Sequence, residues 1–257
     1  MDKSERRKQY WFVIRQLTSR EMKRKYARSK LGVLWSILSP LLNMIVISLV
    51  FTQMFERAIE NYPVYYICGN IIWSFFTVST NTALTSLVDN KNMLIKVKFP
   101  MDIFVISRIT TAFVNFLYTL IPFVLVLCVF RIRPHFTLFF FPVIIFCLLL
   151  FSTGISYILA VVYVFFGDIK HLYSVILTLW MFLSAIFYPA SSLPDYMQTV
   201  IGFNPMFLYI DALRDIVMYG TLPEPVNVIK MFAFAVGFFF IGLWIFKANK
   251  AKIMQKI

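Results

Sequence analysis

Charged residues are scarce in this sequence. Of its 257 residues only 14% are charged, whereas 60% are hydrophobic. A soluble domain typically has about 25% charged residues and roughly 45 to 50% apolar ones. Folding leaves about a quarter to a third of the surface of such a chain in water, so a soluble fold could not hide this much apolar surface. The composition excludes an ordinary soluble domain and predicts an integral membrane protein.

The side chains that build catalytic and metal sites are also rare. The two histidines, His135 and His171, fall in segments predicted to lie on opposite faces of the membrane. A histidine-centred triad or metal site is therefore excluded. The three cysteines each fall inside an apolar run, so no disulfide framework or paired-thiol metal motif is implied. We expect no metal and no catalytic residue in this chain.

A phosphate-binding loop is missing as well. Such a loop needs two glycines five positions apart, followed at once by Lys and then Ser or Thr. Gly237 and Gly242 have this spacing, but Leu243 and Trp244 follow them inside the last apolar run. The chain is not expected to bind ATP itself or to be an enzyme by itself.

Six stretches are long enough to cross a bilayer as helices. A hydrocarbon core of about 30 Å needs about 20 helical residues at about 1.5 Å each. Five charge-free runs reach that length, and a sixth does so if its helix starts near Val226 and Lys230 extends to the interface. The predicted spans lie in the runs 31–55, 61–88, 109–130, 134–167, 171–194 and 226–246. The prediction is an all-α integral membrane domain with six transmembrane helices over residues 31–257.

Two stretches do not fit a simple span. The run 134–167 is too long for one upright helix, and Pro142 suggests that residues 134–140 lie in the interface before the helix begins, although tilt is the alternative. The segment 191–225 is rich in Pro and Asp, and its apolar part is too short to cross and is interrupted by Pro205. We interpret 191–225 as an outer segment with re-entrant helices between spans five and six.

The basic residues are concentrated on one side of the predicted spans. With the N-terminus in the cytoplasm, 20 of the 25 Lys and Arg residues fall in cytoplasmic segments and five in outer ones. The positive-inside rule then predicts a multi-pass protein of the cytoplasmic membrane with both termini cytoplasmic, rather than a nucleic-acid-binding protein. Five spans carry no charge, which disfavours an ion-driven carrier, because such carriers need a ligand at mid-depth. Energy for any transport should come from a cytoplasmic partner.

Three cytoplasmic segments could receive such a partner. Residues 1–30 are predicted to form an amphipathic interface helix. Its apolar stripe consists of Tyr10, Ile14 and Leu17, joined by Trp11 and Val13. The loop 89–100 mixes apolar and basic side chains, and 167–171 is a short turn. The plain alternatives are an ordinary positive-inside loop and a simple helix reversal.

Three motifs follow one another along the chain. The first leads into span one and consists of Tyr26, Ala27, Arg28, Ser29, Leu31, Gly32, Leu34, Trp35 and Pro40. The second is the turn 167–171, Gly-Asp-Ile-Lys-His. The third, in the outer part, consists of Tyr188, Pro189, Pro194, Asn204, Pro205, Met206, Arg214 and Asp215. In order and spacing, these motifs resemble the ABC-2 type permeases that export polysaccharides and teichoic acids, although this chain has Gly167 where that family usually has Arg.

The resemblance implies a permease subunit that forms a homodimer and pairs with two copies of a separate ATP-binding cassette subunit, which binds ATP and Mg²⁺. It implies that the interface helix and the loop after span two contact the ATPase. We assign this coupling to Lys91, Met93, Leu94, Ile95, Lys96, Lys98, Asp168 and His171. In the family the outer segment covers the exit, and we place an outer gate at Asn204, Pro205 and Arg214. The implied cargo is a glycan or teichoic acid carried on a polyprenyl diphosphate.

Two groups of side chains are candidates for contact with that cargo. Arg24, Arg28 and Lys30 crowd the start of span one and could grip a lipid diphosphate, although the positive-inside rule and unspecific binding of anionic lipid explain the same residues. Tyrosine and tryptophan side chains could line a glycan path, and the candidates are Tyr62, Tyr65, Tyr66, Trp73, Tyr157 and Tyr163. The alternatives are an interfacial belt for the first three and core packing for the rest.

Two rival functions are weighed against this prediction. An ABC-2 exporter of a small hydrophobic compound shares the six-span plan, but such permeases usually lack the tyrosine-rich second span and the Leu-Gly-x-Leu-Trp segment. A membrane-embedded lipid-modifying enzyme would need paired carboxylates or histidine near the interface, and Asp89 and Asp102 with only His171 nearby make a poor case. The sequence therefore predicts export of a lipid-linked cell-envelope polymer, powered by ATP hydrolysed elsewhere.

Overall fold

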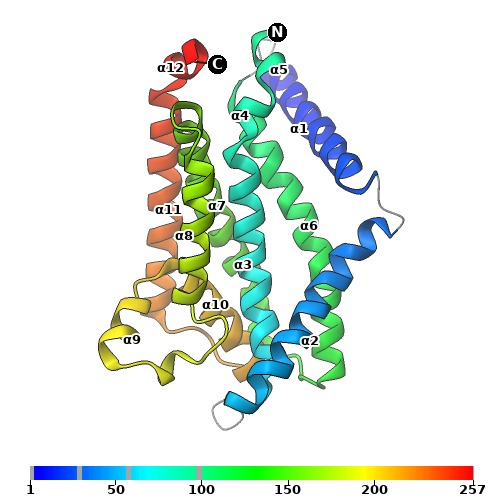
Figure 1. Ribbon diagram of the computed structural model, residues 1–257, viewed down its shortest axis with the longest axis vertical. Coiled ribbons are helices and arrows are strands. Elements are labelled where there is room, and N and C mark those ends of the chain that lie inside the picture. Colours follow the sequence, from blue (N-terminus) through cyan, green and yellow to red (C-terminus); the bar gives the residue numbers. More distant parts are fainter. Residues whose placement is uncertain (1–2, 28–30, 56–58, 97–99, 257) are drawn as a thin grey trace.

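The structure is a computed structural model that describes residues 3–27, 31–55, 59–96 and 100–256 (Figure 1). Within these ranges all regular structure is helical. The long helices are α1 (Lys3–Tyr26), α2 (Trp35–Phe55), α3 (Tyr62–Leu84), α6 (Asp102–Val129), α7 (Phe141–Phe165), α8 (Ile169–Leu183) and α11 (Pro225–Ala248). The short elements are η1 (Gly32–Leu34), α4 (Ser86–Asp89), α5 (Lys91–Lys96), η2 (Phe136–Phe140), η3 (Ala190–Ser192), α9 (Asp195–Ile201), α10 (Pro205–Arg214), the π-helical η4 (Asp215–Tyr219) and α12 (Lys250–Lys256).

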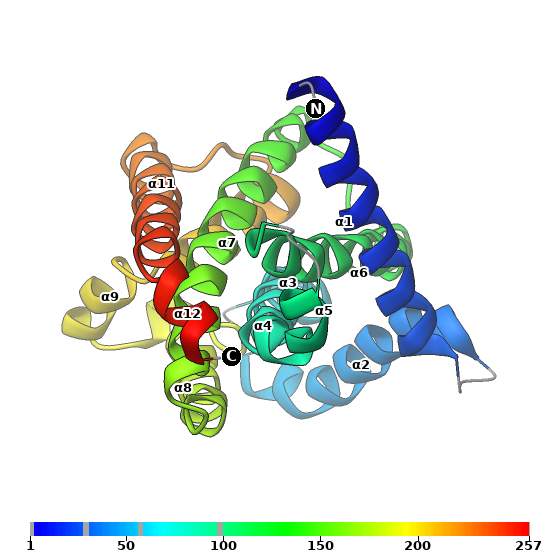
Figure 2. The same ribbon diagram turned by 90° about the horizontal axis from the view of Figure 1, so that it is seen from above.

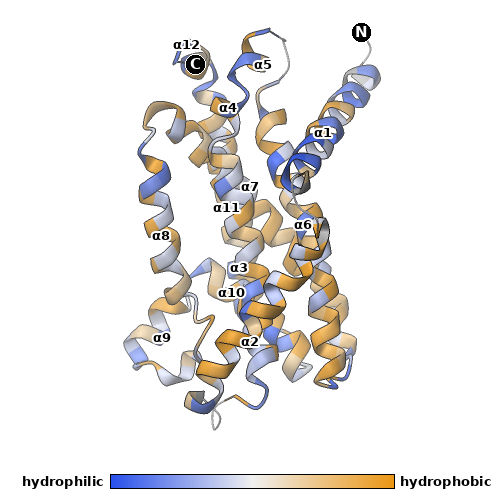
Figure 3. Cartoon of the chain, turned by 45° about the vertical axis from the view of Figure 1, so that its right-hand side comes forward, coloured by the Kyte–Doolittle hydropathy of each residue, from blue (hydrophilic) through white to orange (hydrophobic). Residues whose placement is uncertain are grey.

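Polar and apolar residues are segregated along the molecule. Hydrophilic residues gather on α1 and at the end that carries α4, α5 and α12, whereas the helices between are mainly hydrophobic (Figure 3). Both ends of the chain lie at this same end, which we call the basic end (Figure 1). Termini on one side are what an even number of membrane crossings requires.

Among the described residues, four helical stretches are long and apolar enough to cross a bilayer, namely Trp35–Met54, Asp102–Val129, Phe136–Phe165 and Pro225–Ala248. The second predicted span corresponds to α3, which has 23 residues but carries more polar side chains. The fifth corresponds to α8, which is apolar but only 15 residues long. The all-α membrane class is confirmed, while the number of six crossings stays a prediction.

Helix α8 ends at Leu183, although its charge-free run continues to residue 194. The backbone leaves the helix at Ala185, whose φ of 48° is in the left-handed region. The carbonyls of Ala185 and Ile186 are then bonded to the Arg214 side chain instead of to a following helical turn. The charge-free run therefore overestimated the length of this helix, because the two carbonyls that follow its end accept from a distant cation instead of continuing the helix.

Two predicted boundaries are confirmed. The run 134–167 divides into the separate 3₁₀ helix η2 and helix α7, and Pro142 stands in the first turn of α7, where a missing N–H is tolerated. Helix α11 begins at Pro225, one residue before the predicted start, for the same reason. The Lys230 ammonium reaches the Gly202 carbonyl at 3.4 Å and lies 4.8 Å above the Phe203 ring, so it extends out of the span toward the outer segment.

Helix α1 packs along α6 at the basic end (Figures 1 and 2). Ile14 and Leu17 are buried in a cluster with residues from α6, α7 and the end of α11, as the predicted stripe requires. Trp11, predicted on the same stripe, is 57% exposed and does not pack in this cluster. Its place on a lipid-facing stripe stays a prediction.

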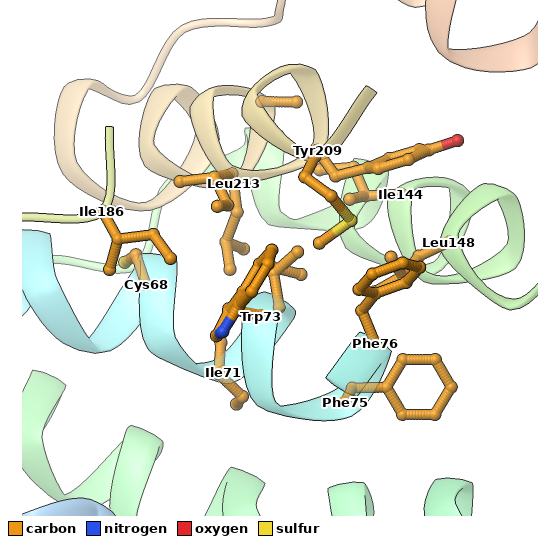
Figure 4. Packing of buried hydrophobic residues seen from close by; sticks show 14 of the residues in the cluster. Cys68, Ile71, Trp73, Phe75, Phe76, Ile144, Leu148, Ile186, Tyr209 and Leu213 are labelled. Carbon is orange, nitrogen blue, oxygen red and sulfur yellow. The ribbon is translucent and has the colours of Figure 1, made fainter. Parts of the chain in front are cut away.

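The main core lies between α3, α7 and α10. In Figure 4, Trp73 and Phe76 of α3 point toward Ile144 and Leu148 of α7 and toward Tyr209 of α10. The outer segment is thus part of the core rather than a loop laid over it. Helices α7 and α11 approach so closely that a Cβ atom on Gly154 would overlap the Phe238 backbone and one on Gly242 would overlap the Gly154 carbonyl. Gly242 therefore serves close helix packing, as small residues do in membrane proteins.

Candidate functional site

Arg214 joins three separate elements. Its side chain is 1% exposed at the end of α10. The guanidinium donates to the carbonyls of Ala185 and Ile186 at 3.1 Å each and to that of Tyr65 at 3.4 Å, and it lies 3.4 Å above the centre of the Tyr65 ring. Gly69 provides the room, since a Cβ there would stand 3.1 Å from the guanidinium. The planar five-donor group of arginine suits this cluster of acceptors.

Asn204 holds the outer segment against the end of α8. Its side-chain oxygen accepts from the Met206 amide at 3.0 Å, which caps α10, and from Trp180 Nε1 at 2.8 Å. Its amide nitrogen donates to the Leu183 carbonyl at 2.9 Å. Pro205 occupies the first turn of α10, where its missing N–H costs nothing. The structure therefore brings together the three residues predicted as an outer gate, all at the junction of α8 and α10.

Acidic side chains lie close to this junction. Burial raises the pKa of Asp211 above its ordinary value, although the nearby Arg214 charge opposes that rise. Burial, together with Asp211 and Glu224, raises the pKa of Asp215 to about 6. Asp215 therefore carries a proton in an increasing fraction of molecules as pH falls toward this value.

The predicted glycan path is not formed by the aromatic side chains assigned to it. Tyr62, Tyr65, Tyr66, Trp73 and Tyr157 are each at most 7% exposed within this chain, and Tyr163 is partly buried against the main core. Tyr62 Oη donates to the Phe187 carbonyl at 2.9 Å, and Tyr65 Oη donates to the Tyr188 carbonyl at 2.8 Å. These hydroxyls hold the chain that follows α8. The four side chains on α3 pack in the main core, Tyr157 of α7 packs in the cluster at the basic end, and the path assignment is corrected accordingly.

An ion-pair network connects α1 with the segment after α3. Arg108 of α6 donates to Glu21 of α1 at 2.6 Å and to Asp89 of α4 at 3.1 Å. The side chains of Arg108 and Glu21 are only 13% and 11% exposed, so this pair is screened less than a surface pair. Arg20 adds a bond to Asn90 Oδ1 at 2.9 Å. The interface helix, α4 and α6 are thereby tied together at the basic end.

The predicted coupling residues are not equally accessible. Leu94 is 5% exposed and packs in the cluster that includes Ile14, so it cannot act as an anchor for a partner, and that assignment is corrected. Its neighbour Ile95 is 61% exposed. Met93 is partly buried. Lys91, Lys96, Asp168 and His171 are exposed at the basic end, whereas Lys98 lies outside the described residues.

A polar cleft lies between α2, α3 and α6, with the last turn of α1 at its margin. Its volume is 390 Å³. Lys25 Nζ donates to Asn115 Oδ1 at 3.1 Å at one side of the cleft. The cleft is lined by Lys25, Trp35, Ser36, Ser39, Pro40, Asn43, Asn70, Ser74, Phe75, Val78, Ala112, Asn115, Phe116 and Thr119.

The residues predicted to bind a diphosphate lie differently. Arg24 is exposed on α1 and does not line this cleft. Arg28 and Lys30 lie outside the described residues. Lys25, which follows Arg24 in the sequence, was not predicted as a binding residue. Neither were the cleft residues Asn43, Asn70 and Asn115. The position of these asparagines within apolar runs was the signal in the sequence that could have identified them. Amide side chains are costly in a membrane span unless they have a role.

Comparison with known proteins agrees with this architecture. Residues 13–218 match the ABC-2 type transporter family. Over 252 residues the chain is 31% identical to an O-antigen export system permease protein RfbA from Myxococcus xanthus, covering 97% of this chain and 96% of that one. An RfbA permease from Klebsiella pneumoniae is 29% identical over 93% of this chain and 92% of its own. The polysialic acid transport protein KpsM from Escherichia coli is 22% identical over 94% and 95%.

The family match includes most of α1, the helices α2 to α8 and the outer segment through η4. It therefore contains the Arg214 site, the ion-pair network and the polar cleft. Together with the all-helical membrane architecture, this match shows that the chain belongs to the ABC-2 type transporter family.

Proposed function

We propose that this chain is the permease subunit of an ATP-driven exporter that moves a polyprenyl-diphosphate-linked cell-envelope polysaccharide or teichoic acid across the cytoplasmic membrane. The observation that carries the proposal is the similarity, over nearly the full length of both chains, to permeases named for O-antigen export and polysialic acid transport. A separate ATP-binding cassette subunit, in two copies, binds ATP and Mg²⁺ and drives the cycle.

A transport assay in inverted membrane vesicles tests this function. Vesicles that contain the permease and its ATPase should take up an undecaprenyl-diphosphate-linked glycan into their lumen when ATP is added. A non-hydrolysable ATP analogue should support no uptake. ATP-driven uptake of a small hydrophobic dye without any uptake of the glycolipid would contradict the proposal and favour the small-compound exporter.

The ATPase docks at the basic end, on the surface formed by α5 and the turn between α7 and α8. Exposed Ile95 is the apolar contact, with Lys91 and Lys96 as its charged margin. Apolar residues at the centre of an interface carry most of its binding energy. Replacement Ile95→Asp should reduce ATP-driven uptake about tenfold, since about 1.4 kcal/mol of lost contact is a tenfold change in affinity.

Two measurements distinguish docking from folding in this variant. Ile95→Asp should insert normally but release the ATPase during purification. The control Tyr196→Asp lies on the exposed outer helix α9, away from α5, and should retain the ATPase. Retention of the ATPase and full uptake in Ile95→Asp would show that docking occurs elsewhere.

Both termini and the basic end face the cytoplasm in this proposal, because most of the basic residues are found there. Single cysteines at Lys252 and Asp195 provide the test, since both positions are exposed. A membrane-impermeant thiol reagent should label position 195 in intact cells and position 252 only after lysis. Labelling of position 252 in intact cells would reverse the proposed orientation.

The functional unit is a homodimer. Helices α2 and α8 flank α3 on one face of the molecule (Figures 1 and 2). Each presents apolar side chains outward, including Leu49 at 76% exposure on α2 and Leu179 at 61% on α8. A second copy facing this surface would enclose a path between the two subunits, and lipid would cover the remaining apolar helix faces.

A further inference from the structure

The cleft between α2, α3 and α6 contains polar groups at a depth where they are costly. Asn43 lies eight residues after Trp35, which is about 12 Å along α2. Asn70 lines the same cleft from α3. Within the part of the chain that the structure describes, neither side-chain amide forms a hydrogen bond. Asn43 is exposed and Asn70 is half-buried, so both amides are accessible to water or to a ligand in the cleft, and in a membrane span such groups are unfavourable without a partner.

The cleft also has a defined charge. Lys25 lies at the margin where α1 ends and α2 approaches, and Asn115, which is 8% exposed, accepts its hydrogen bond. This bond fixes the position of the ammonium group beside the cleft. No carboxylate is found among the lining residues. The site is therefore cationic at its margin and hydrogen-bonding within, which suits an anion with hydroxyl or amide groups attached.

The remaining lining is apolar and aromatic. Trp35, Pro40, Phe75 and Phe116 contribute carbon surface on three helices. The volume of 390 Å³ lies within the range of about 300 to 1,000 Å³ of small-molecule sites. It is large enough for two phosphates and a sugar ring but not for a polymer, so the cleft can hold only the beginning of a lipid-linked chain.

We propose that this cleft binds the diphosphate and first sugar of a polyprenyl-diphosphate-linked glycan, an inference that rests on the proposed function. Lys25 contacts the diphosphate, and Asn43 and Asn70 bind polar groups of the first sugar. The polyprenyl chain leaves along the apolar side of the cleft toward lipid. Recognition of the phosphate group is thereby assigned to Lys25, which lines the cleft, and not to Arg24, which does not.

Thiol protection in a purified complex tests the site. The permease with its ATPase is placed in phosphatidylcholine nanodiscs after Cys128→Ser, because Cys128 is exposed while Cys68 and Cys147 are buried. Ser39→Cys provides a reporter inside the cleft, and Asp195→Cys provides a control at an exposed position of the outer segment. The probe is undecaprenyl diphosphate carrying one N-acetylglucosamine.

The probe should slow maleimide labelling at position 39 about tenfold and at position 195 by less than about twofold, as expected for a site nine-tenths occupied. Adding Lys25→Gln to the reporter should remove most of this protection. The matched change Lys23→Gln alters an exposed lysine on the same helix that does not line the cleft, and it should leave protection intact.

Two results would overturn the inference. Equal protection by phosphatidylglycerol would identify a general site for anionic headgroups. Absence of protection by the probe, in a complex whose vesicles still export the glycolipid, would show that the cleft is not its site while leaving the proposed function intact. The vesicle assay tests the proposed function separately. A complex that does not export the glycolipid would contradict that function, whatever the labelling result.

Discussion

Replacement Arg214→Ala is expected to destabilise the permease by about 3 kcal/mol or more and to abolish most export. The change removes the charged donor from the carbonyls of Tyr65, Ala185 and Ile186; Ala185 still accepts from Tyr65 Oη at 3.3 Å, whereas Ile186 loses the donor that it has in the structure. An unsatisfied buried acceptor costs about 1 to 3 kcal/mol. Because these carbonyls belong to α3 and to the chain after α8, the outer segment should lose its fixed position before the remaining helices unfold.

Thermal unfolding of the solubilised complex and uptake into vesicles measure these two effects. Arg214→Lys should give an intermediate result, since one ammonium group cannot match the fork of three nitrogens. Gly69→Val should resemble Arg214→Ala, because its side chain would occupy the space of the guanidinium. Arg133→Ala, a change at an exposed arginine, serves as the control. An unchanged unfolding temperature in Arg214→Ala would refute the structural role of this residue.

Replacement Arg108→Ala is expected to separate ATP hydrolysis from export. Arg108 is bonded to Glu21 of the interface helix and to Asp89 of α4, beside the surface proposed to receive the ATPase. Without it, a movement imposed on α4 and α5 would no longer be carried to α1 and α6. Export should fall at least about tenfold, because two charged hydrogen bonds are lost and even one is worth about 1.5 to 3 kcal/mol, while ATP hydrolysis continues.

The ratio of glycolipid exported to ATP hydrolysed is the decisive measurement. Arg108→Lys keeps the charge but cannot contact both carboxylates through one planar group, so it should retain part of the coupling. Arg15→Ala, at an exposed position of the same interface helix, should leave the ratio unchanged. A normal ratio in Arg108→Ala would show that coupling does not pass through this network.

The membrane class, the helical runs and the charge asymmetry follow from the sequence alone. Each depends on a local sum of transfer free energies or of charges along one segment, which needs no knowledge of neighbouring segments. The starts of α7, near Pro142, and of α11, at Pro225, could also be predicted from the local sequence. Proline favours the first helical turn wherever the helix lies in the fold. The three ordered motifs were sufficient to indicate the family.

The roles of individual side chains were decided only by the tertiary structure. Tyr62 and Tyr65 resemble path-lining residues in the sequence, yet their hydroxyls bond to the chain more than 100 residues further on. Leu94 is as apolar as Ile95, but the fold buries one and exposes the other. Arg24 and Lys25 are adjacent and alike in charge, but only Lys25 reaches Asn115. A hydrogen bond depends on positions to within a few tenths of an ångström, and these are set by how distant helices pack, which no local pattern contains.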